Sequence, residues 1–137
     1  MSNIPEQPTC GKGLAENSVL PGKLGELVGA MGEVLEVHMR ALDLNDVNSK
    51  QEFEAYKALA REHREIAAGL AAAAREMAGY RDLPMGRHDE KAMAEPRALE
   101  VFENFVRHKQ ELLALLQETI EQDQQMLDQM GKALTSS

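Results

Sequence analysis

Three of the four histidines lie on predicted helix faces, where their imidazoles could bind a metal ion. His38, His63 and His108 each have apolar residues three or four positions away, which is the spacing of a single helix face. A neutral imidazole donates a nitrogen to a divalent metal, and nearby carboxylates balance the charge of the cation. These residue types raise the hypothesis of a metal site inside a helical bundle.

The predicted helix lengths decide which histidines could share one ion. When the helices pack side by side, the heights of His38 and His63 along the bundle are expected to differ by about nine residues, or about 13 Å. That distance is too long for both to bind one ion. His63 and His108 are expected at nearly the same level, with Glu33 within a turn of it. Glu111 follows His108 by one turn on the same face. The predicted ligands for iron or zinc are therefore His63, His108, Glu111 and Glu33.

Each histidine also fits a purely structural role, as a core or boundary residue whose ring hydrogen-bonds a carboxylate or a backbone carbonyl. Carboxylate-bridged di-metal bundles usually supply two Glu-x-x-His units from different helices. This sequence contains no Glu-x-x-His unit. Any likeness to ferritin-like bundles is confined to the ligand types, and both roles stay open.

The elements that would position these residues are helices. Apolar residues recur at alternating spacings of three and four, and only 4% of residues are aromatic, so a core of Leu, Ala, Val and Met is expected, which favours helices over sheets. The pattern predicts an all-α, antiparallel up-down bundle of three long helices over about 21–43, 49–79 and 95–131, with a short fourth helical segment possible within 81–94. Pro21 fits a first helical turn, and Ser49 with Glu52 fits a capping box.

The chain ends lack this periodicity. Residues 1–17 predict a flexible N-terminal tail, residues 18–131 a single helical-bundle domain, and residues 132–137 a frayed C-terminus. The third helix is expected to stop at Gly131, because glycine commonly ends helices.

Glycines recur along one face of the first predicted helix, and alanines fill the second half of the next. A glycine inside a helix costs up to about 1 kcal/mol relative to alanine, so such a stripe calls for a packing reason. Folding the hairpin about Asp46 would bring Gly22 level with Leu70 and Gly25 level with Ala67. We therefore expect close backbone approach between these two helices.

The net charge of −8 opposes binding to nucleic acids. No apolar run has the length that a membrane-spanning helix needs. Residues 1–13 show no secretion signal, and Cys10 is the single cysteine, so a cytoplasmic location is expected.

These features favour a non-catalytic binding or scaffolding bundle, expected to be homo-oligomeric or to bind a partner protein through helix faces. No arrangement of nucleophile, base and acid suggests an enzyme. One alternative is a metal-binding bundle with a storage or redox role. Another is a cytoplasmic adaptor or export chaperone for an amphipathic helix.

Overall fold

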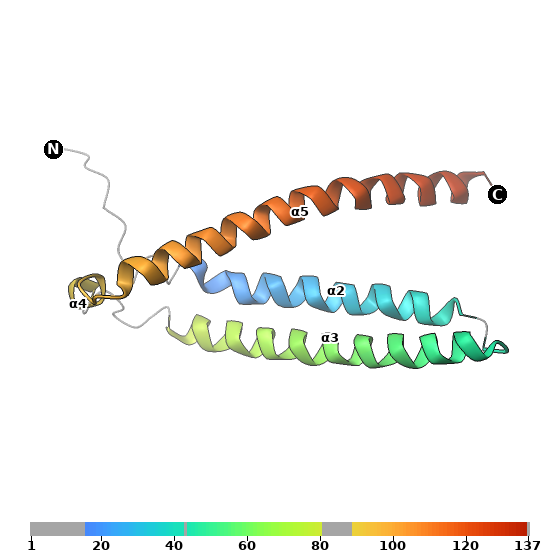
Figure 1. The fold of residues 1–137 in the computed structure, drawn as a ribbon, viewed down its shortest axis with the longest axis horizontal. Helices are drawn as coiled ribbons and strands as arrows, with labels where there is room; N and C mark the ends of the chain where they lie inside the picture. Colours follow the sequence, from blue (N-terminus) through green and yellow to red (C-terminus); the bar gives the residue numbers. More distant parts are fainter. Residues whose placement is uncertain (1–15, 43, 81–88, 137) are drawn as a thin grey trace. The chain divides into compact units, whose positions relative to one another are not determined.

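The computed structural model describes residues 16–42, 44–80 and 89–136. Its elements are the 3-10 helix η1 (Asn17–Val19) and the helices α2 (Leu20–Arg40), α3 (Val47–Tyr80), α4 (Asp89–Met93) and α5 (Ala98–Thr135) (Figure 1). The described part of the chain contains no strand, so the predicted all-α class is confirmed. The chain divides into two compact units, residues 1–89 and 90–137.

The first unit is an antiparallel hairpin of α2 and α3, with η1 packed at its open end (Figure 1). Pro21 lies in the first turn of α2, as predicted. The helix ends at Arg40, about one turn before the expected end, where the Ala41 N–H donates to the carbonyls of Val37 and His38. Those bonds tighten the last turn and satisfy carbonyls that would otherwise lack a partner.

The first turn of α3 is capped by Asp46, so the capping box predicted at Ser49 is wrong. The Asp46 carboxylate accepts the Asn48 N–H at 3.2 Å and the Ser49 hydroxyl at 3.5 Å. The backbone carbonyl of Asp46 accepts the Lys50 N–H at 3.1 Å. An aspartate oxygen that binds a first-turn N–H is a strong N-cap, and it starts the helix at Val47, ahead of the serine.

The glycine stripe of α2 faces α3, as expected. A Cβ atom added at Gly22 would lie 3.4 Å from Ala74 Cβ, and one at Gly32 would lie 3.4 Å from His63 Cβ. The predicted pairing of Gly22 with Leu70 is therefore wrong by about one turn, whereas the predicted contact of Gly25 with Ala67 is found. The contacts between small residues set the position of α2 relative to α3 along their common axis. As a result, α3 begins beyond the end of α2 (Figure 1).

This packing leaves much of the apolar surface of α2 uncovered. Because glycines occupy the contact, the larger side chains lie on the flanks and on the outer face. Those that remain exposed are Leu27, Met31, Val34 and Val37. Among the described residues only Ala60 is a buried apolar residue. The hairpin therefore holds together through close backbone approach and carries apolar surface outside its small core.

The second unit consists of α4 and α5. Helix α4 is the short segment expected within 81–94, although residues 81–88 lie outside the described part. Helix α5 begins at Ala98, about one turn later than predicted, with the Glu95 carboxylate accepting the Arg97 N–H at 2.9 Å. Its antiparallel packing against the hairpin remains a prediction, as do the expected domain limits. The expected tail to residue 17 lies almost wholly outside the described residues.

Helix α5 runs through Gly131 and ends at Thr135. None of the described glycines has a positive φ, so Gly131 does not adopt the left-handed conformation of a helix terminator. Instead the Lys132 carbonyl accepts the hydroxyls of Thr135 at 3.0 Å and Ser136 at 2.8 Å. These bonds satisfy a terminal carbonyl and extend the helix beyond its expected end.

Candidate functional site

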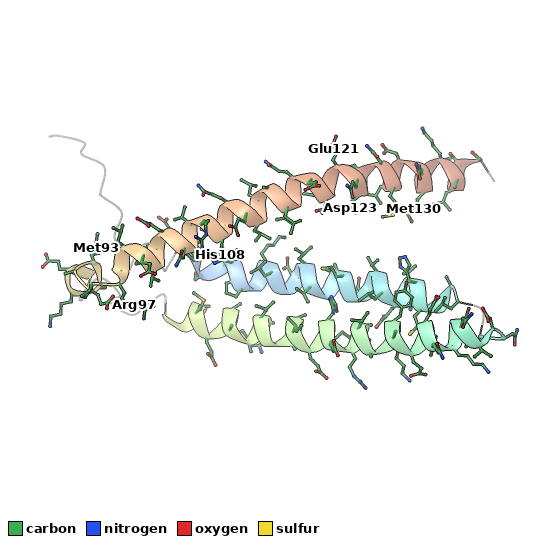
Figure 2. All side chains as sticks on the ribbon, in the orientation of Figure 1. Met93, Arg97, His108, Glu121, Asp123 and Met130 are labelled. Atoms are coloured by element: carbon green, nitrogen blue, oxygen red, sulfur yellow. The ribbon has the colours of Figure 1, made fainter. Side chains whose placement is uncertain are left out.

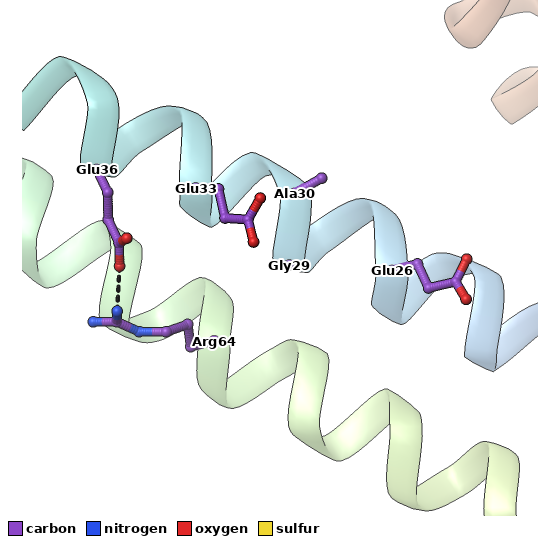
Figure 3. Close-up of a pocket in the computed structure, with 6 residues that line it drawn as sticks. All are labelled: Glu26, Gly29, Ala30, Glu33, Glu36 and Arg64. Carbon is purple, nitrogen blue, oxygen red and sulfur yellow. Dashed lines mark hydrogen bonds and ion pairs between the residues drawn. The ribbon is translucent and has the colours of Figure 1, made fainter.

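The polar side of the hairpin contains a shallow depression of about 540 Å³ (Figure 3). Gly29 and Ala30, which carry almost no side chain, line it. The charged groups around it are Glu26, Glu33, Glu36 and Arg64. Glu26 is paired with Lys23 at 3.0 Å. Of the described residues that line this depression, none is a histidine, a cysteine or a residue with a hydroxyl group.

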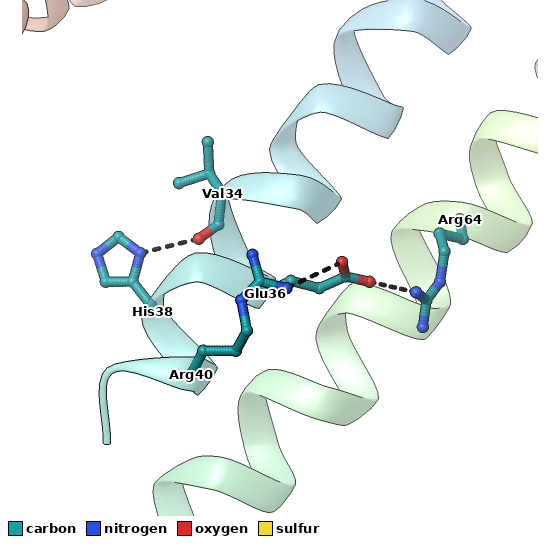
Figure 4. Close-up of polar contacts among 5 residues, drawn as sticks. All are labelled: Val34, Glu36, His38, Arg40 and Arg64. Atoms are coloured by element: carbon teal, nitrogen blue, oxygen red, sulfur yellow. Dashed lines mark hydrogen bonds and ion pairs between the residues drawn. The ribbon is translucent and has the colours of Figure 1, made fainter. Parts of the chain in front are cut away.

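Glu36 connects the two helices of the hairpin (Figure 4). Its carboxylate accepts a hydrogen bond from Arg64 of α3 and lies 4.0 Å from the Arg40 guanidinium of α2. The Glu36 side chain is 24% exposed, whereas that of Arg64 is 61% exposed. Because the guanidinium is largely exposed, the pair stabilises the hairpin by about 1 kcal/mol or less.

His38 and His63 both hydrogen-bond to their own helices. His38 Nδ1 donates to the Val34 carbonyl at 3.0 Å (Figure 4), and its ring stacks on Tyr56 with centroids 5.8 Å apart. His63 Nδ1 donates to the Leu59 carbonyl at 2.7 Å. In this tautomer Nε2 of each ring carries the lone pair, the arrangement that also suits a metal ligand. The structural alternative predicted for these histidines matches these bonds.

His108 and Glu111 form a pair on one face of α5, as their spacing predicts. His108 Nδ1 lies 3.5 Å from a Glu111 carboxylate oxygen, and both side chains are more than half exposed. Two predicted metal ligands are thus neighbours within the second unit.

The other two predicted ligands, Glu33 and His63, belong to the hairpin. Glu33 lines the depression, and His63 packs its Cβ against the neighbouring Gly32. Across the described residues, no group of three or more His, Cys, Asp or Glu side chains is arranged to hold a metal ion. The four-residue iron or zinc site remains a prediction, since it requires groups from both units.

The most extensive feature of the second unit is an apolar face along α5. Every seventh residue of this helix is apolar, at positions 99, 106, 113, 120, 127 and 134. Such a sustained repeat is the mark of a helix that packs in a coiled coil. The alternating spacing of three and four predicts a helix here but does not single out the repeat of seven, which is readable from the sequence.

The apolar face of α5 has no covering element within its own unit. No residue of this 38-residue helix is buried. Leu99 and Leu134, near its two ends, are 72% and 79% exposed. Asp123 and Met130 project from one side of α5, whereas Glu121 projects from the opposite side (Figure 2). An apolar face of this length on a long helix is a candidate contact surface.

No family model, curated protein or solved structure matches this chain. Evidence for function therefore comes from the residues themselves. Among the described helices, none combines the length and apolar character needed to cross a membrane. The α5 face is the strongest candidate for a functional surface, because it is long, regular in sequence and unburied.

Proposed function

We propose that this protein is a non-catalytic scaffold that forms homo-oligomers through the apolar faces of its helices. The observation that carries the proposal is the apolar repeat of seven along α5, a helix in which no residue is buried. Burying apolar surface gains about 25 cal/mol per Å², so a regular apolar face of this length favours association. A cytoplasmic location is part of the proposal and accords with the single cysteine.

The outer face of the hairpin supports the same role. Leu27, Met31 and Val34 of α2 are exposed because glycines occupy the contact with α3. The side chains of Leu59 and Ile66 on α3 are exposed as well. Each unit thus offers apolar helix surface to another protein chain, the way in which helical scaffolds bind. The same surface would accept an amphipathic helix of another protein, which is the adaptor alternative.

A single charge in the repeat tests the proposal. Leu113→Glu places a carboxylate in the middle of the apolar face, whereas Gln125→Glu adds the same charge on the opposite face of α5. Burial of one leucine contributes about 1.5–3 kcal/mol, so Leu113→Glu should raise the dissociation constant at least about tenfold. Gln125→Glu should leave it within about twofold of the unchanged protein.

The measurement is molar mass by light scattering and sedimentation over a range of concentrations. The unchanged protein should exceed the 15.1 kDa of one chain, and Leu113→Glu should shift it toward that mass. A protein that stays at 15.1 kDa at every concentration contradicts the proposal, as does a Leu113→Glu variant that associates like the Gln125→Glu control.

A further inference from the structure

We infer that α5 pairs with α5 of a second copy in antiparallel orientation, and that Lys109 and Asp123 set this orientation. The inference rests on the proposed function, because it requires self-association, and it adds the partner surface and its geometry. It is carried by the charges placed within the apolar repeat of α5.

The second line of core positions in the repeat contains two charged residues. In a coiled coil the first and fourth residues of each heptad meet the partner helix. With Leu99 at a first position, the fourth positions are Phe102, Lys109, Leu116, Asp123 and Met130. Lys109 and Asp123 have opposite charges and lie at equal distances before and after Leu116. The charge pattern is therefore complementary to itself when reversed about Leu116.

Parallel pairing would place like charges together. In a parallel, in-register pair, identical positions face each other, so Lys109 would meet Lys109 of the second copy. Asp123 would likewise meet Asp123 of the second copy. Like charges repel in the partly desolvated contact between the two helices. This repulsion disfavours the parallel arrangement.

Antiparallel pairing brings the opposite charges together. In an antiparallel coiled coil, each fourth position lies level with a first position of the other helix. When the two-fold axis lies between Leu113 and Leu116, Lys109 of each copy is in the layer next to Asp123 of the other. The same arrangement sets Leu116 level with Leu113 of the second copy and Phe102 level with its Leu127. Both ion pairs form at once, since the symmetry repeats each contact. Buried polar pairs of this kind fix register and orientation more than they add stability.

The positions that flank the core of the coiled coil do not determine the orientation of the two helices, so Lys109 and Asp123 determine it. In many coiled coils, charges at the fifth and seventh heptad positions decide the orientation. Here the fifth positions after Glu103 are Gln110, Gln117 and Gln124, and the seventh positions include Phe105, Leu112 and Met126. These side chains are uncharged, so they do not favour either orientation electrostatically.

The conformation of the Lys109 side chain suits a position in the contact between the two α5 helices. Its Nζ lies 5.0 Å from the centroid of the Phe105 ring, one turn earlier on α5. A lysine buries its aliphatic stem along apolar surface and keeps the ammonium at the edge. From that edge the ammonium can reach a carboxylate on the second helix.

Antiparallel pairing has a consequence for a scaffold. The N-terminal ends of the two α5 helices, which connect to the rest of each chain, lie at opposite ends of the pair. A helix of 38 residues is about 57 Å long at 1.5 Å per residue. The pair would therefore separate the two points of attachment by roughly the length of α5.

Charge reversal in the full-length protein tests the orientation. Lys109→Asp and Asp123→Lys each place like charges together in an antiparallel pair, so each should raise the dissociation constant at least about tenfold. The double variant Lys109→Asp/Asp123→Lys restores both pairs and should return the constant to within about threefold of the starting value. Glu118→Lys, on the outer face of α5, is the matched control and should change little.

A parallel pair predicts a different result. Each of these variants then still faces its own copy with like charges, so the single and double variants associate equally. That outcome overturns the inference while leaving the proposed function standing. A protein that is monomeric in every form overturns both. Helix content is compared by circular dichroism so that loss of association is separated from loss of α5.

Distances between spin labels give an independent measurement. Labels are placed on the outer face at Glu100, near the start of α5, and at Glu118, near its middle, in a Cys10→Ser background. In an antiparallel pair the two Glu100 labels lie about 45 Å apart or more along the axis, and the two Glu118 labels lie much closer. Equally short distances at both sites would overturn the inference.

Discussion

Gly25 of α2 lies so close to Ala67 of α3 that a Cβ atom at position 25 would stand 3.3 Å from the Ala67 carbonyl oxygen. The same Cβ would lie 3.3 Å from Leu70 Cβ. A backbone oxygen and a Cβ atom move only when the helix itself moves. The contact between α2 and α3 is therefore set by the backbones at this level, and dispersion contacts offset part of the glycine cost.

The first prediction compares two glycines that receive the same change. Gly69→Ala should raise the free energy of unfolding by up to about 1 kcal/mol, because alanine is the better helix former and no atom lies within 4 Å of a Cβ at that position. Gly25→Ala should lose this gain, since the added methyl group pushes against Ala67 and Leu70. Overpacking costs about 1–3 kcal/mol, so Gly25→Ala should be at least about 1 kcal/mol less stable than Gly69→Ala.

Tyrosine fluorescence during urea unfolding measures this difference selectively. Both tyrosines of the chain, Tyr56 and Tyr80, lie in α3, and there is no tryptophan. The signal therefore follows the hairpin and not α5. A Gly25→Ala variant as stable as Gly69→Ala would show that the helices are not in tight contact.

Local spacing predicted much of the hairpin. The 3-4 periodicity predicted α2 and α3, and the glycine and alanine stripes predicted their contact. The predicted contact between Gly25 and Ala67 is found, whereas the residue that faces Gly22 lies about one turn further along α3 than predicted. The start of α3 was also placed too late, because Asp46 is an N-cap that competed with the capping box at Ser49. Such competition is decided by the geometry of a few atoms, which spacing does not encode.

Only part of the predicted metal site follows from local spacing. His108 and Glu111 are neighbours because they are one turn apart on α5, which any helix guarantees. The meeting of His63 with His108 depends on packing between separate units, which helix periodicity does not determine. The α5 repeat was present in the sequence, but a search for positions three and four apart does not separate it from an ordinary amphipathic helix.

The second prediction concerns the ion pair between Glu36 and Arg64. Removing either side chain as Glu36→Ala or Arg64→Ala should lower the free energy of unfolding by about 1 kcal/mol or less, because the guanidinium is largely exposed. A double-mutant cycle isolates the coupling between the two side chains. That coupling should fall at high salt. A coupling of zero at low salt would show that the pair does not form in solution.

The third prediction tests the four-residue metal site. If His63, His108, Glu111 and Glu33 bind iron or zinc, the protein should retain metal in a fixed ratio after dialysis. The ion should also raise Tm, with about 2.7 kcal/mol of stabilisation at one hundred times Kd. The double variant His63→Ala/His108→Ala should lose both effects, because it lacks the two imidazole ligands. Elemental analysis and thermal unfolding are the measurements.

His38→Ala is the matched control for the metal site. It removes an imidazole that stacks on Tyr56 and was excluded from the ligand set by its height along α2. Metal content should therefore stay unchanged in this variant. A protein that retains no metal and gains no stability from added ions contradicts the site.

The last prediction tests which residue caps α3. Asp46→Ala removes the carboxylate that accepts the Asn48 N–H, so it should lower the free energy of unfolding by about 1 kcal/mol. Ser49→Ala removes a hydroxyl that lies within the first turn and donates to Asp46, and it should cost about 0.5 kcal/mol or less. Asp46→Asn keeps an accepting oxygen and should retain most of the stability. The reverse order, with Ser49→Ala the more damaging change, would restore the capping box at Ser49 and shorten α3.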